Sequence, residues 1–97
     1  MGAAERHRRV SAYRITFSAQ ARADLLALGE LLAQEVLVGI TAELGTDPHG
    51  GTSIERPLGG GPWDRVAFVA GWATVRYLVS EGPGIDPPVI TVIRVIP

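Results

Sequence analysis

A stripe of aliphatic side chains in the first half of the chain is the feature that most restricts its fold. Six of them recur every three or four positions and therefore stack on one face of a helix: Leu25, Leu28, Leu32, Val36, Ile40 and Leu44. This face has to be buried against another layer. Gly29 interrupts the stripe, and glycine inside a helix costs about 1 kcal/mol relative to alanine. We therefore expect two helices folded back as a hairpin, which begins at Ala19 and closes at residues 45–48.

The segment before the hairpin has the period of a strand. Tyr13, Ile15 and Phe17 alternate with polar residues and share one face. Ser18 stands where the period changes from two to that of a helix. Its hydroxyl is able to accept a hydrogen bond from a free amide of the first turn, so we expect Ser18 to be the N-cap.

Three segments in the second half are rich in valine, isoleucine and aromatic residues and predict further strands. They are residues 63–70, 73–80 and 89–96. The last is apolar on both faces, so we expect it in the interior of the sheet. Residues 49–62, rich in glycine and proline, predict a surface loop. The order predicts an α+β domain: an N-terminal strand, a helical hairpin, then a three-stranded antiparallel meander in one sheet, with the helices on one face.

Length and composition predict one small globular domain. The 97 residues have 46% hydrophobic and 20% charged side chains, unlike a disordered chain. We divide them into a flexible basic tail, residues 1–12, and a single domain, residues 13–97. Without cysteine there is no disulfide or thiolate site, and the compartment expected is the cytoplasm. No apolar run is long enough to span a membrane, so we expect no membrane partner.

Sites for cofactors and metals are not expected. The two histidines, His7 and His49, are isolated and cannot supply the three or four ligands of a zinc site. The triple glycine at residues 59–61 is not followed by the lysine and hydroxyl residue of a phosphate-binding loop. No nucleophile elbow occurs. A pocket beside Trp63 and Trp72 is the only support for a small-molecule enzyme, and aromatic residues on strands are more often core.

Arginine residues on the strands are the remaining candidates for chemistry. Arg65, Arg76 and Arg94 lie in the three C-terminal strands, and Arg56 just precedes them. Because a guanidinium is always charged and binds two oxygens at once, a patch of these residues would suit an RNA backbone or an acidic protein segment. The alternative is that these arginines face solvent or pair with Asp64 and Glu81. The net charge of −1 and the pI near 6.1 lack the basic excess usual in nucleic-acid binding.

Five passages in the same order resemble the RelE/ParE superfamily, the toxins of bacterial type II toxin–antitoxin systems. Each is a loose consensus, and the resemblance covers about residues 13–96. The passages are YRITFS (13–18) with ARADL (21–25), TDP (46–48), RPL (56–58) with Trp63, GWATVRY (71–77) and VIRV (92–95).

The resemblance implies a fold, partners and a function. Family members fold as a helical hairpin on a small, strongly curved antiparallel sheet. One branch cleaves mRNA on the ribosome, the other poisons DNA gyrase, and an antitoxin silences both. This implies a growth-inhibiting toxin component with a cognate antitoxin, acting on translation or on gyrase. If it is an enzyme, it is a metal-independent endoribonuclease with RNA-binding side chains.

The candidate site follows from what RNA cleavage without a metal requires. The reaction needs a base for the 2′-hydroxyl, a cation for the phosphate and a proton donor for the leaving oxygen. We assign Arg76, Arg94 and Tyr77 as the catalytic candidates, for the cation and donor roles. The binding candidates are Arg56, Arg65 and His49, the only imidazole of residues 13–97.

Departures from the family pattern favour a second hypothesis. Ala73 and Thr74 stand where members have tyrosine and arginine, and the sequence ends at Pro97 where they continue with a basic and aromatic tail. The alternative is a non-catalytic module of the same fold, a degenerate toxin that binds a protein or oligomerises. That hypothesis predicts a homodimer or partner complex through the apolar faces of residues 89–96.

Overall fold

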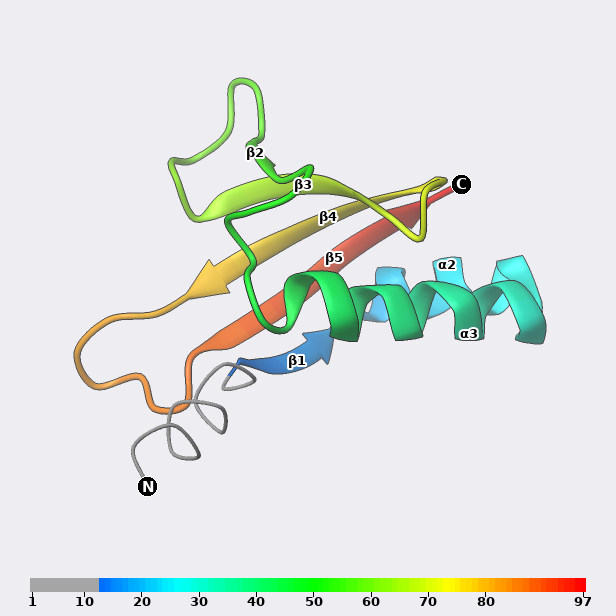
Figure 1. Cartoon of the computed structure of the whole chain (residues 1–97), viewed down its shortest axis with the longest axis horizontal. Helices are drawn as coiled ribbons and strands as arrows, with labels where there is room; N and C mark the ends of the chain where they lie inside the picture. The colour runs from blue at the N-terminus through cyan, green and yellow to red at the C-terminus, as the bar shows by residue number, and fades with distance from the viewer. Residues whose placement is uncertain (1–12) are drawn as a thin grey trace.

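The computed structural model describes residues 13–97, so the tail predicted at residues 1–12 lies outside the described part (Figure 1). The helical elements are α2 (Ala19–Leu28), α3 (Glu30–Gly39) and the π-helix η1 (Ile40–Leu44). The strands are β1 (Arg14–Phe17), β2 (Ile54–Glu55), β3 (Asp64–Val69), β4 (Ala73–Ser80) and β5 (Val89–Ile96). The predicted α+β class is confirmed.

The sheet is mixed and has five strands in the order β1-β5-β4-β3-β2. β3, β4 and β5 form the antiparallel succession expected of the C-terminal half. β1 runs parallel to β5 and occupies an edge, with Arg14 opposite Val89 and Phe17 opposite Val92. β2 lies inside the segment predicted as a loop and pairs with β3, so four strands were too few. A strand of two residues is too short to show an alternation of apolar and polar side chains, so only its pairing with β3 identifies it.

The hairpin forms as the sequence predicts. Ser18 has extended backbone angles, and its Oγ accepts from the amide of Ala21 at 3.0 Å, so the N-cap is confirmed. Gly29 separates α2 from α3 with φ of 87°, a conformation that other residues rarely adopt. Figure 1 shows α3 returning beside α2. η1 continues α3, and the Gly45 amide donates to the Ile40 carbonyl at 3.0 Å.

The core lies between the hairpin and one face of the sheet. β4 contributes every second residue, and Val75 and Tyr77 have no exposed surface. β5 lies between β1 and β4, which confirms its interior position. Four residues of the helical stripe are buried: Leu25, Val36, Ile40 and Leu44. Leu32 is 46% exposed, contrary to the expectation for the whole stripe, because it lies near the Gly29 end of the hairpin, which extends past the strands (Figure 1).

Candidate functional site

Tyr77, a predicted proton donor, is part of the core. Its side chain is completely buried, and its hydroxyl donates to the Pro48 carbonyl and lies within hydrogen-bond distance of the Ser53 hydroxyl. Burial raises the pKa of this phenol, which weakens it as an acid. A donor for an RNA leaving group has to reach the substrate, and Tyr77 is enclosed in this structure.

Arg65 lies directly opposite Tyr77 in the pairing of β3 with β4, on the same buried face. Its side chain donates from Nε to Ser53 Oγ at 2.7 Å and from Nη1 to the Pro62 carbonyl at 2.8 Å. Arg65 is 9% exposed. These contacts tie the loop before β3 to the core and leave little of the Arg65 side chain exposed to a ligand.

Arg94 forms a two-pronged ion pair with Asp24 of α2. Nε and Nη2 lie 2.8 and 3.2 Å from the two carboxylate oxygens. The same carboxylate accepts from the amide of Val95 at 2.9 Å. The hydrogen bonds from Arg94 are the largest cause that lowers the pKa of Asp24 to about 2. β1 pairs with β5 only as far as Val92. Beyond that residue, Asp24 of α2 bonds to the same edge of β5 in place of β1.

Arg56 and Arg76 meet at Asp64, on the sheet face away from the hairpin. Arg56 donates hydrogen bonds from Nε and Nη2 to the Asp64 carboxylate at 2.9 to 3.1 Å, and the Gly60 amide donates to the same carboxylate at 3.1 Å. These contacts lower the pKa of Asp64, and the hydrogen bonds from Arg56 are the largest cause. Arg76 Nε lies 3.9 Å from the Asp64 carboxylate. This nitrogen atom is buried and has no hydrogen bond, although 38% of the Arg76 side chain as a whole is exposed.

His49 lies in a separate cluster at one end of the sheet. Its Nε2 is 2.6 Å from Glu81, whose second oxygen accepts from the Tyr13 hydroxyl at 2.6 Å. The hydrogen bond from Tyr13 and the contact with His49 lower the pKa of Glu81, whereas burial and the carboxylate raise the pKa of Tyr13 to about 12. His49 therefore joins the loop after η1 to the ends of β1 and β4.

The six predicted site residues do not form one site. Arg76 and Arg94 are directly opposite in the pairing of β4 with β5, and Arg56 shares Asp64 with Arg76. Arg65 and Tyr77 lie on the buried face, and His49 belongs to the Glu81 cluster. Among the four arginines of this set, Arg56 and Arg94 are paired with carboxylates and Arg65 is held by Ser53 and Pro62, so within residues 13–97 Arg76 is the one whose side chain is partly exposed and has no carboxylate contact shorter than 3.9 Å. The arrangement lacks a base and a proton donor beside that cation.

Trp63 and Trp72, beside which a pocket was considered, lie at opposite ends of β3. Trp63 precedes β3 and Trp72 follows it, so the strand separates them by about 20 Å. Trp72 donates from Nε1 to Glu35 of α3, and Trp63 lies against Gly61.

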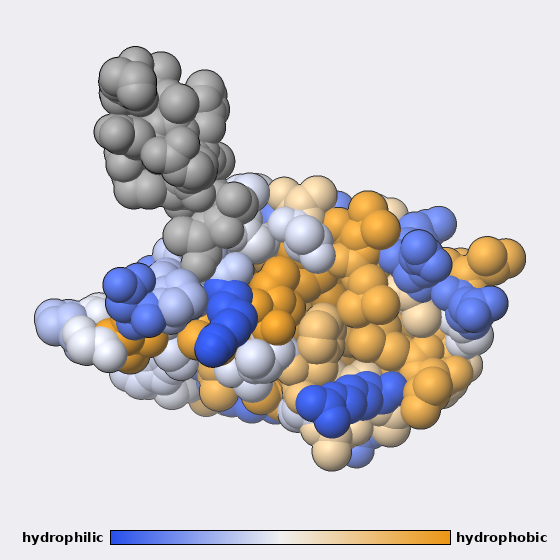
Figure 2. All heavy atoms as spheres, turned by 90° about the horizontal axis from the view of Figure 1, so that it is seen from below, coloured by the Kyte–Doolittle hydropathy of each residue, from blue (hydrophilic) through white to orange (hydrophobic). Residues whose placement is uncertain are grey.

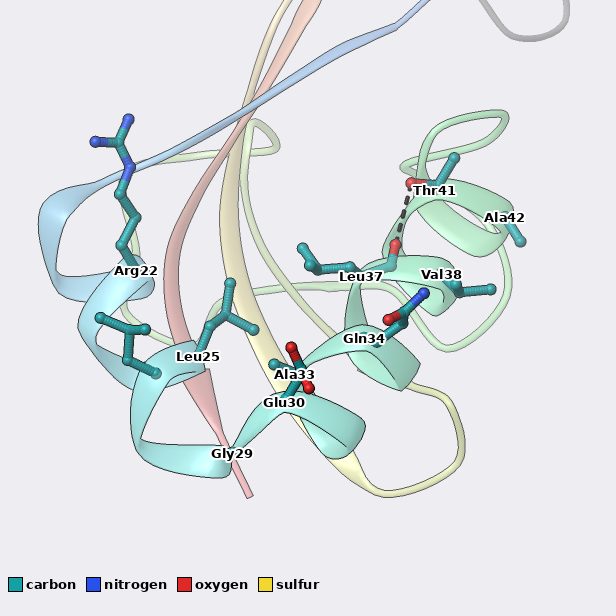
Figure 3. A pocket seen from close by; sticks show the side chains of 11 residues that line it. Arg22, Leu25, Gly29, Glu30, Ala33, Gln34, Leu37, Val38, Thr41 and Ala42 are labelled. Carbon is teal, nitrogen blue, oxygen red and sulfur yellow. Dashed lines mark hydrogen bonds between the residues drawn. The ribbon is translucent and has the colours of Figure 1, made fainter.

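An apolar groove between α2 and α3 is the feature that sequence reasoning missed. It encloses about 980 Å³ and is lined by both helices and the start of η1. Leu25 and Leu37 face one another across it (Figure 3). Leu26 and Val38, also in its lining, are 83% and 60% exposed. Figure 2 shows that the hydrophobic surface on this side of the molecule is continuous.

The signal for this groove was present in the helices. Leu26, Leu31, Leu37 and Val38 lie off the six-residue stripe, so both helices carry more apolar residues than one buried face needs. A helix that is hydrophobic on several sides is normally covered on several sides. Only one covering layer, the sheet, is found among residues 13–97.

Other kinds of site receive no support from the described part of the chain. No helix among residues 13–97 has the length and hydropathy needed to cross a membrane. Within the same residues, no three histidine, aspartate or glutamate side chains come together as metal ligands would. Comparison of the chain with models of protein families, with curated proteins and with solved structures finds no significant match.

Proposed function

We propose that the chain is a non-catalytic protein-binding module with a RelE/ParE-like fold, whose binding surface is the groove between α2 and α3. The groove carries this proposal. Monomeric proteins seldom expose a continuous apolar patch of more than a few hundred Å², and larger patches usually mark a binding site. An apolar channel between two helices fits a helical partner, which would lay its own apolar face into it.

The positions of the predicted catalytic residues favour binding over RNA cleavage. Tyr77 is enclosed, Arg94 is held by Asp24, and His49 is held by Glu81. These contacts stabilise the domain, and releasing a side chain from them to act on a substrate would cost that stability. The order of strand, helical hairpin and antiparallel strands supports the fold resemblance, whereas the parallel pairing of β1 with β5 departs from the antiparallel sheet that the resemblance implies.

Arg76 favours a second candidate, a toxin that acts on translation or gyrase and is held by an antitoxin. Its guanidinium lies on the sheet face opposite the hairpin, partly exposed, with Nε unpaired. A phosphate or carboxylate would satisfy this group. A single cation supplies only one of the three roles that RNA cleavage needs, so this candidate is second.

Two measurements separate the candidates. Expression of the chain in a tightly controlled bacterial host should leave growth and mRNA intact, and so should expression of Arg76→Ala. Growth arrest that Arg76→Ala abolishes would establish the toxin and overturn the module.

The binding surface is tested with the purified chain. Amphipathic helical peptides selected from a displayed library should bind wild type and lose at least tenfold in affinity for Leu26→Glu and Val38→Glu. Leu58→Glu is the matched control, since Leu58 is fully exposed on a loop outside the groove. Peptides that bind all three variants equally would place the surface elsewhere and overturn the proposal.

A further inference from the structure

The rims of the groove are as apolar as its floor. Leu26 on α2 and Val38 on α3 project beside it, and Leu31, at the Gly29 end of the hairpin, is 84% exposed. Complete burial of each of these side chains is favourable relative to exposure. The occupant therefore has to cover the two ridges as well as fill the channel. A single peptide strand or a small molecule would leave the ridges in water.

A second hairpin has the shape to do this. α3 and η1 together have 15 residues, about 22 Å in length, and two adjacent helices are roughly 20 Å wide. Two such faces together would bury on the order of 1,000 Å² of accessible surface, the lower limit for a specific interface. Two helical hairpins packed face to face give a four-helix bundle, in which the ridges of one hairpin enter the groove of the other.

The charges along the groove favour a copy of the same surface. The lining contains one cation, Arg22 in the first turn of α2, and one anion, Glu30 at the start of α3. Figure 3 shows them at opposite ends of the groove, and neither forms an ion pair with another residue of 13–97. A strongly acidic or strongly basic partner would gain no net electrostatic attraction from one cation and one anion. A two-fold axis that reverses the hairpin places Arg22 of each copy near Glu30 of the other.

We propose that the occupant of the groove is a second copy of this chain, and that the α2–α3 hairpins of two copies form a four-helix interface. The inference rests on the proposed function, since it names the partner of the same surface. The Arg22 and Glu30 contacts set the antiparallel orientation of the hairpins, and the apolar ridges supply most of the affinity. Of the two faces of residues 89–96 that the second hypothesis assigned to this role, one lies in the core, with Ile90, Val92 and Val95 buried, and the rest of the strand is half-buried apart from the exposed Ile96.

Sedimentation equilibrium of the purified chain tests the interface. Wild type should have twice the 10.3 kDa of the single chain. Leu26→Glu and Val38→Glu should sediment as monomers, or with a dissociation constant at least 100-fold higher, whereas Leu58→Glu should remain a dimer. Far-ultraviolet circular dichroism establishes that each variant is folded, which is expected because the altered side chains are exposed. A wild-type monomer at 100 μM, or a dimer that both groove variants leave intact, would overturn the proposal.

Charge reversal identifies the second copy as the occupant. Arg22→Glu or Glu30→Arg alone places like charges together twice per dimer and should weaken it about tenfold. A mixture of the two single variants should restore the affinity as a heterodimer, because both contacts again join opposite charges. Variants that weaken nothing, or a mixture that restores nothing, would overturn the antiparallel arrangement. A monomeric chain that still binds helical peptides in the groove would overturn the second copy and leave the proposed function standing.

Discussion

Asp24 of α2 and Arg94 of β5, 70 positions apart, form an ion pair whose shorter contact is 2.8 Å. Asp24 also accepts from the Val95 amide, so one carboxylate holds both a side chain and the backbone of the last strand. The pair fastens the hairpin to β5 where the parallel pairing with β1 has ended. It orients the hairpin whose outer face carries the proposed interface.

Replacing Asp24 with asparagine should lower stability in a pH-dependent way. The folded state holds the pKa of Asp24 at about 2, below the ordinary 3.8, so the unfolded chain takes up the proton first as pH falls. The stabilisation is present above about pH 5 and is lost as pH approaches 2. Thermal unfolding should therefore show Asp24→Asn several degrees less stable than wild type at pH 7, with the gap closing towards pH 2. Glu55→Gln, at an exposed position on β2, is the control and should show no such gap. A gap independent of pH would contradict the role of the charge.

Tyr77→Phe should cost about 1 to 2 kcal/mol of unfolding free energy, because the buried hydroxyl contacts Pro48 and Ser53. Tyr13→Phe is the matched control and should cost less, since the bond from Tyr13 to Glu81 is exposed to water. Urea unfolding of both variants measures the difference. Unchanged stability of Tyr77→Phe, together with loss of a growth arrest caused by wild type, would return Tyr77 to a chemical role.

Gly39→Ala should destabilise the domain by about 1 to 3 kcal/mol through overpacking. An added Cβ would lie 2.6 Å from Val69 Cγ1 and 3.2 Å from the amide nitrogen of Ala70. Gly60→Ala places its Cβ no closer than 3.6 Å to Trp63, so it should change stability by less than about 0.5 kcal/mol. Equal effects of the two substitutions would show that α3 does not approach β3 this closely.

Arg56 and Arg76 should contribute differently to the stability of the domain, although both face Asp64. Arg56→Met removes a two-pronged pair with a buried carboxylate and should lower the unfolding midpoint by several degrees. Arg76→Met removes a contact of 3.9 Å and an unpaired buried nitrogen, so the midpoint should change little. A larger loss for Arg76→Met would mean that Arg76 is the principal partner of Asp64.

Local sequence patterns were sufficient for most of the helices and strands. The positions of Ser18 and Gly29 follow from capping and from the backbone freedom of glycine, which depend on neighbouring residues alone. The interior place of β5 followed from its two apolar faces. The short β2 was missed because its two residues acquire their conformation only by pairing with β3.

The candidate site was less accessible to prediction. Three predicted residues, Arg56, Arg76 and Arg94, do lie on one sheet face or its edge, as alternation along the strands allows. The alternative that these arginines pair with Asp64 holds for Arg56, whereas the pairing of Arg94 with Asp24 was not foreseen. Tyr77 and Arg65 were assigned to chemistry by residue type, and the direction of each side chain relative to the hairpin placed them in the core instead.

The sequence by itself determined the α+β class, the hairpin and the interior position of β5, because periodicity and capping are interactions within a few residues. Only the tertiary structure decided which charges are paired and which apolar residues stay exposed. Both depend on distances between segments up to 70 residues apart, and no local pattern encodes those distances. The excess of apolar residues on α2 and α3 was visible in the sequence, but only the finished packing leaves Leu26 and Val38 uncovered.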